Sequence, residues 1–181
     1  MFYTGIIFFF GVHLIPLNTH LKKILKTRLG EGPYIGLFSL LSLVGFLLII
    51  FGYESSSNFL YSTNINAFIY SKYIMFLSLT TLIAANFPTY IKKYSKHPMS
   101  LGIAIWSILH LLTNSDSSSV ILFSSFLIYA IVSVLIAELR NATIKQSTPK
   151  IMFDVLSIIL GGLLTMLAFN FHEYLSGVDL I

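Results

Sequence analysis

Five histidines are the residues in this chain whose type and placement could support metal or cofactor chemistry. They are His13, His20, His97, His110 and His172. The sequence around most of them is strongly apolar, and an ionisable side chain in such sequence is by default a functional-site hypothesis. A neutral imidazole nitrogen is also a common metal ligand. The chain contains no cysteine, which excludes thiolate ligands, disulfides and thiol catalysis.

The densest cluster of candidate residues lies between Lys96 and Asp116. His97 directly precedes Pro98, and proline suits the first position of a helix, so the sequence predicts His97 as the N-cap of an apolar helix. Residues at intervals of four form one stripe along that helix. The stripe consists of Gly102, Trp106, His110 and Asn114. Glycine admits a close neighbour or a flat ligand, and tryptophan donates a hydrogen bond, but the spacing is equally typical of a helix–helix packing seam.

A second cluster joins the first apolar segment to the next one. Arg28 and Tyr34 flank a Gly-Pro turn, and Pro33 opens the following helix. Both side chains are placed to bind anionic groups of a ligand. Lipid headgroup anchoring explains the same two residues equally simply.

The composition is that of an integral membrane protein. Of the 181 residues, 56% are hydrophobic and only 10% are charged, and the mean hydropathy is +0.85. Soluble domains carry about 25% charged residues. The apolar runs are continuous, which favours helices over the alternating strands of a barrel. We therefore expect an all-α, polytopic bundle that forms one domain over residues 1–181.

Six apolar segments predict six transmembrane helices. They run roughly over residues 2–17, 34–53, 68–88, 98–113, 118–137 and 151–172. Most approach the ~20 residues that span a bilayer, whereas the first and fourth are short. Gly45 and the Gly161–Gly162 pair are small residues that let helices approach closely.

The basic residues predict the topology. Ten of the eleven Lys and Arg residues fall in three loops on one side, and only Lys72 lies near the other side. The ten are Lys22, Lys23, Lys26, Arg28, Lys92, Lys93, Lys96, Arg140, Lys145 and Lys150, and the opposite side holds Glu54, Asp116, Glu173 and Asp179. The positive-inside rule therefore places both termini on the non-cytoplasmic side. Asp116 is expected to cap a helix end there. The basic residues flank membrane segments, so the net charge of +4 does not indicate nucleic-acid binding.

This topology sorts the histidines by depth. His13 and His97 share the cytoplasmic depth, His110 and His172 share the outer depth, and His20 is a solvated loop residue. His110 lies 13 residues beyond His97, about 20 Å along a helix. Two axial nitrogens on one iron lie only ~4 Å apart, so His97 and His110 cannot bind the same iron. The pairs His13–His97 and His110–His172 both stay open.

Four pieces of sequence, in order, resemble the NnrU family of small bacterial membrane proteins. The likeness covers roughly residues 5–135 and says little about residues 138–181. The pieces are Gly11-Val12-His13; Arg28-Leu29-Gly30-Glu31-Gly32-Pro33-Tyr34 with the residues up to Leu40; His97-Pro98-Met99-Ser100-Leu101-Gly102; and Leu109-His110-Leu111-Leu112-Thr113-Asn114-Ser115-Asp116.

The resemblance implies a multi-pass protein of the bacterial inner membrane with a role in nitrogen-oxide metabolism during denitrification. It also implies kinship with the plant cis-zeta-carotene isomerase, a haem b enzyme, and hence isomerase-like redox chemistry on a hydrophobic small molecule. His13 and His97 would be the metal ligands of haem b. Arg28, Tyr34 or Lys96 would lie near the propionates, with Trp106, His110 and Asn114 as further cofactor-binding residues. The chain departs from the pattern where Lys96 replaces the usual Arg, and in having no cysteine.

Two other interpretations compete with the hypothesis of a haem protein. Integral membrane methyltransferases that use S-adenosylmethionine also carry an Arg-His-Pro piece followed by Gly, where this chain has Lys96-His97-Pro98. They usually show an acidic pair further on, and here only Glu138, beside Arg140, stands in that region. In the third interpretation, the chain is a non-enzymatic assembly protein whose polar residues only cross-link its helices.

Overall fold

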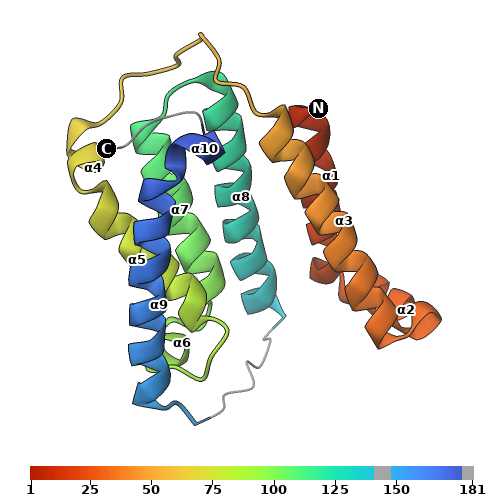
Figure 1. Ribbon diagram of the computed structural model, residues 1–181. Coiled ribbons are helices and arrows are strands. Elements are labelled where there is room, and N and C mark those ends of the chain that lie inside the picture. Colours follow the sequence, from red (N-terminus) through yellow and green to blue (C-terminus); the bar gives the residue numbers. More distant parts are fainter. Residues whose placement is uncertain (141–147, 177–181) are drawn as a thin grey trace. The chain divides into compact units, whose positions relative to one another are not determined.

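A computed structural model describes residues 1–140 and 148–176, and within them the fold is all-helical (Figure 1). Lys145 and Asp179, which entered the predicted topology, lie outside the described residues. The chain forms two compact units, residues 1–55 and 56–181, and each is described by itself. The helices are α1 (Phe2–Leu17), α2 (Thr19–Leu29), α3 (Glu31–Gly52), α4 (Ile65–Ile69), α5 (Ser71–Ala84), α6 (Tyr90–Ser95), α7 (Pro98–Thr113), α8 (Ser117–Leu139), α9 (Ile151–Asn170) and α10 (His172–Ser176).

In the first unit, glycines let α1 and α3 pack backbone against backbone. A Cβ atom added to Gly45 would lie 2.9 Å from the Cα of Phe9, and one added to Gly5 would lie 2.7 Å from the amide nitrogen of Ile49. Helices in a membrane associate through close packing of this kind. The hydrophobic effect contributes little there, because lipid tails are as apolar as the side chains themselves. The predicted packing role of Gly45 is therefore confirmed.

The chain turns sharply where α1 meets α2. The two helices are bent by 92° at Asn18. Pro16 lies in the last turn of α1, and the side chain of Asn18 accepts a hydrogen bond from the amide of Leu21 at 3.0 Å, which caps α2. The basic stretch that the sequence analysis treated as a loop is thus a helix, because its Lys and Leu residues are good helix formers with a cap in front.

In the second unit, α5 lies between α7 and α9, and α8 packs on the other side of α7. Small residues again bring the axes together. A Cβ on Gly102 would lie 2.6 Å from Cγ of Leu82, and one on Gly161 would lie 2.8 Å from the Cα of Thr80. The hydroxyl of Ser78 donates to the carbonyl of Gly102 at 2.8 Å and ties α5 to α7.

Two buried carboxylates close opposite ends of the second unit. Asp116 is the N-cap of α8, and its Oδ1 accepts from the amides of Ser119 at 3.1 Å and Ser56 at 3.3 Å. Its predicted capping role is confirmed. Asp154, near the start of α9, accepts from the amides of Tyr90 and Ile91 at 3.0 and 3.1 Å and so holds the start of α6.

The helices match the six predicted segments, but fewer of them are clear membrane spans. By length and composition, α3, α8 and α9 could each cross a membrane, and the bent pair α1–α2 passes the same test when taken as one span. α5 and α7 are apolar but shorter. Several apolar helices therefore support a polytopic membrane bundle, with three or four clear spans among the described residues where the sequence predicts six.

Candidate functional site

His13 is held in one orientation by its own helix. It is half-buried, and its Nδ1 lies 2.8 Å from the carbonyl oxygen of Phe9, one turn earlier. A carbonyl can only accept, so Nδ1 carries the hydrogen and Nε2 is the basic nitrogen of the neutral ring. The imidazole stacks on the Phe9 ring at 4.1 Å and meets the edge of Phe38 from α3 at 5.3 Å. The first unit therefore presents an oriented imidazole between two aromatic rings.

Tyr34 continues this aromatic row along α3. Its ring lies 6.5 Å from that of Phe38, and the ammonium of Lys26 lies 5.8 Å from the Tyr34 ring centroid. Tyr34 is only 7% exposed, and its hydroxyl has no hydrogen-bond partner within the described structure. A buried donor without a partner carries a desolvation cost, so this hydroxyl would gain from a hydrogen bond to a ligand or a water molecule. Arg28, the other residue predicted beside it, is exposed on α2.

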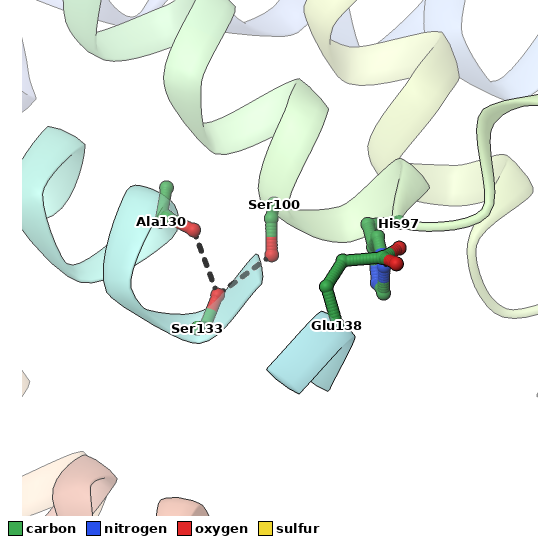
Figure 2. Close-up of polar contacts among 5 residues, drawn as sticks. All are labelled: His97, Ser100, Ala130, Ser133 and Glu138. Atoms are coloured by element: carbon green, nitrogen blue, oxygen red, sulfur yellow. Dashed lines mark hydrogen bonds and ion pairs between the residues drawn. The ribbon is translucent and has the colours of Figure 1, made fainter. Parts of the chain in front are cut away.

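His97 lies in the second unit as the N-cap of α7, as predicted, with Pro98 at the first helical position. Its side chain does not cap the helix. Instead its Nε2 lies 2.8 Å from Oε1 of Glu138 in the last turn of α8, and Figure 2 shows the carboxylate reaching the ring. One turn along α7, the hydroxyls of Ser100 and Ser133 meet at 2.8 Å and link the same two helices. The start of α7 is thus fastened to the end of α8 by two polar contacts.

The backbone before His97 is strained. Lys96 has φ of 56° and ψ of −47°, and it is the one non-glycine residue with positive φ in the described part of the chain. The amide of His97 donates to the carbonyl of Ser95 at 2.6 Å across it, which makes Lys96 the centre of a γ-turn of the rare, strained kind. Strain of this type concentrates at functional sites. The turn sets the direction in which His97 enters α7.

The predicted stripe on α7 divides between two neighbours. Gly102 faces α5, as described above, whereas Trp106 and His110 pack half-buried against α8. The His110 ring stacks on Phe123 at 4.4 Å, and Trp106 meets Phe123 edge-on at 5.0 Å. Asn114 is the C-cap of α7, and its amide donates to the carbonyl of His110 at 3.1 Å. The stripe therefore serves packing and capping in addition to any role in binding.

The structure brings together the outer pair of histidines. Nδ1 of His110 lies 2.8 Å from the carbonyl of Trp106, and the ring centroids of His110 and His172 are 6.5 Å apart. His13 and His97 belong to different units, so their pairing stays a prediction. His20 is exposed on α2, as expected for a solvated residue.

Loop 56–64 packs over the end of α7. The Tyr61 hydroxyl donates to the carbonyls of Leu111 and Asn114, the latter at 2.9 Å. Partial burial, with a smaller contribution from the Asp116 carboxylate, raises the pKa of Tyr61. The Tyr61 hydroxyl is therefore a neutral hydrogen-bond donor at physiological pH.

A family model described as NnrU protein matches residues 1–180. The chain belongs to the NnrU family. Neither the comparison with curated proteins nor that with solved structures gives a match. The family match includes residues 138–180, about which the sequence resemblance said little, so α9 and α10 belong to the NnrU fold as well.

Two acidic residues of this NnrU chain make contacts that the sequence does not predict. Glu138 was noted, but its contact with His97 was not predicted, because 41 residues separate the two. Asp154 was overlooked, although a carboxylate in the first turn of an apolar helix is itself a signal of importance. Its two bonds to backbone amides assign it a structural role.

The imidazole nitrogens of this NnrU chain are chemically suited to bind a haem iron. In His13 and His110 a helix carbonyl holds the Nδ1 hydrogen, so Nε2 is the basic nitrogen. In neutral His97 the hydrogen on Nε2 faces the Glu138 carboxylate, so Nδ1 is the basic nitrogen. Metal-binding histidines usually donate their second ring nitrogen to a carbonyl or carboxylate in this way. The Tyr34 hydroxyl adds a buried donor for an anionic group.

Proposed function

We propose that this NnrU protein is a bacterial inner-membrane haem b protein with a role in nitrogen-oxide metabolism. His13 and His97 are the proposed axial ligands. The observation that carries the proposal is the arrangement in the first unit, where an oriented, half-buried His13 and a buried Tyr34 hydroxyl without a partner lie along one aromatic row. Family membership supports it, since haem and denitrification are what the resemblance implies.

The chain's own residues have distinct parts in this proposal. Phe9 and Phe38 restrict the His13 ring and keep water from it, because aromatic rings cover two of its sides. Glu138 orients His97 and raises its basicity. Tyr34, Arg28 and Lys96 bind the carboxylates of the cofactor at the membrane boundary, where anionic groups are solvated. A bound haem iron would supply one-electron chemistry or a site for a small nitrogen oxide.

The same proposal includes isomerase-like chemistry on a hydrophobic small molecule. The half-buried Trp106 and His110 and the capping Asn114 are the residues proposed to contact such a molecule.

The proposal also includes six membrane crossings with both termini outside, in which α5 and α7 are short spans. Helices of 14 and 16 residues are about 21 and 24 Å long, which requires local thinning of the bilayer.

An absorption spectrum tests the haem proposal. The full chain is purified in mild detergent, both as isolated and after incubation with hemin. We expect a Soret band that persists through size-exclusion chromatography in a 1:1 ratio to protein. The absence of a retained Soret band under both conditions would overturn the proposal.

A second candidate is a membrane methyltransferase that binds S-adenosylmethionine. One observation favours it specifically. Glu138, the acidic residue that this function requires, lies beside His97 of the Lys96-His97-Pro98 piece. Calorimetric titration with S-adenosylmethionine distinguishes the two. Micromolar binding, lost in Glu138→Gln, supports the methyltransferase, whereas no binding of either hemin or S-adenosylmethionine leaves the non-enzymatic assembly protein.

A further inference from the structure

The geometry of α2 suits the boundary of a membrane. This helix leaves α1 at 92°, and only Gly30 separates it from α3, which is long and apolar enough to cross a bilayer. α1 and α3 run along each other, so a helix perpendicular to α1 lies close to the membrane plane when α3 crosses the bilayer (Figure 1). Glu31, the first residue of α3, adjoins the end of α2.

The sequence of α2 suits this position because it is amphipathic. Apolar residues recur at the spacing of one helical face, and polar residues occupy the next. The apolar face consists of Leu21, Ile24, Leu25 and Leu29, and the polar face of Thr19, Lys22, Lys23, Lys26 and Thr27. Arg28 lies on the apolar face in the last turn, where its long side chain can extend to the headgroups. Leu21 and Leu29 remain about two-fifths exposed. A helix with a basic face and an apolar face lies in the interface, with the apolar face towards the acyl chains.

The polar face contains a shallow, largely open surface cavity of about 460 Å³. Its lining consists of Thr19, Lys22, Lys23, Lys26, Thr27 and Glu31. Lys26 pairs with Glu31 at 2.5 Å, so one ammonium is neutralised. Within the described residues, Lys22 and Lys23 have no carboxylate within 4.0 Å. Three lysines and one glutamate therefore leave the cavity lining with a net positive charge, beside the hydroxyl groups of Thr19 and Thr27.

We propose that this cavity binds the headgroup phosphate of an anionic phospholipid, with Lys22 and Lys23 as its cationic contacts. An ammonium on a long, flexible side chain binds phosphate as a point charge and tolerates a mobile ligand. A lipid fits better than free phosphate, because its acyl chains can follow the exposed leucines while its phosphate reaches the lysines. Tethering to the bilayer also raises the local concentration of the phosphate.

Titration of the full chain in detergent tests this site without the charge of a leaflet. Native mass spectrometry would measure the binding of dioctanoyl phosphatidylglycerol and of dioctanoyl phosphatidylcholine. We expect at least tenfold tighter binding of the phosphatidylglycerol. Lys22→Gln with Lys23→Gln should weaken it about 25-fold, at about fivefold for each lysine, and leave phosphatidylcholine binding unchanged.

Two control variants locate the effect. Lys22→Arg with Lys23→Arg keeps both charges and should retain the preference, which separates charge loss from misfolding. Lys93→Gln removes an exposed charge from α6, outside the cavity lining, and should change affinity less than twofold. Equal affinity for the two lipids, or equal weakening by Lys93→Gln, would overturn the proposal. Displacement of the lipid by millimolar inorganic phosphate would also overturn it, since the site would then bind free anions.

Discussion

His13 and His110 share one local arrangement, in which Nδ1 contacts the carbonyl one helical turn earlier. The bond fixes the ring orientation and makes Nε2 the basic nitrogen, which prepares each ring to bind a metal or accept a hydrogen bond. His97 differs because its ring contacts a carboxylate from another helix. At the scale of single residues, therefore, each candidate histidine ligand has its ring oriented by an oxygen atom. The oxygen belongs to a backbone carbonyl for His13 and His110 and to a carboxylate for His97.

Tyr34→Phe separates a binding role from a packing role. Removal of a buried hydroxyl that has no partner should leave the apo protein as stable or stabilise it by about 1 kcal/mol. If the hydroxyl binds a propionate, the same variant should bind hemin several-fold more weakly. Thermal unfolding without hemin and hemin titration measure the two effects. A less stable apo protein with unchanged hemin affinity would contradict the binding role.

Asp154→Ala should destabilise the second unit by about 1–3 kcal/mol, because it leaves the partly buried amides of Tyr90 and Ile91 without acceptors. Asp154→Asn keeps one acceptor oxygen and should cost less. The melting temperature in detergent measures both, and Glu173→Ala, at an exposed carboxylate, is the control. Equal melting temperatures for all three variants would show that the two bonds contribute nothing.

At the scale of helices, close packing through glycine is the feature most open to test. Gly45→Ala and Gly161→Ala place a Cβ within 3 Å of a neighbouring backbone and should destabilise the fold by about 1–3 kcal/mol. Gly36→Ala, where nothing lies within 4 Å of the added atom, should be neutral or slightly stabilising. Thermal unfolding of the three variants measures the contrast. A Gly36→Ala protein as unstable as the other two would contradict the packing account.

The sequence predicts the apolar helices well, since a run of apolar residues bounded by turns has few alternatives in a membrane. It misses α2 and α6, because their lysines resemble a solvated loop until the caps at Asn18 and Thr89 are recognised. The contact between His97 and Glu138 depends on how α7 packs against α8, and the strain at Lys96 depends on the turn between α6 and α7. Neither follows from spacing along the chain.

At the scale of the whole molecule, the placement of basic residues predicts that both termini lie outside. Alkaline phosphatase fused after Ile181 should be active, and the same enzyme fused after Lys93 should be inactive, because it folds only in the periplasm. A six-span protein gives this pattern, with α5 and α7 as short spans. Activity of a cytoplasmic reporter at Ile181 would contradict the topology, and with it the shared depth of His13 and His97.

The most direct measurement of the central claim is the absorption spectrum of the hemin-loaded protein in four histidine variants. His13→Ala and His97→Ala should each abolish or shift the Soret band, since each removes one proposed axial ligand. His20→Ala, at an exposed position on α2, should leave the band unchanged, and His172→Ala should have little effect. A Soret band that is unchanged in His13→Ala and in His97→Ala but lost in His172→Ala would contradict the account. It would assign the haem to His110 and His172.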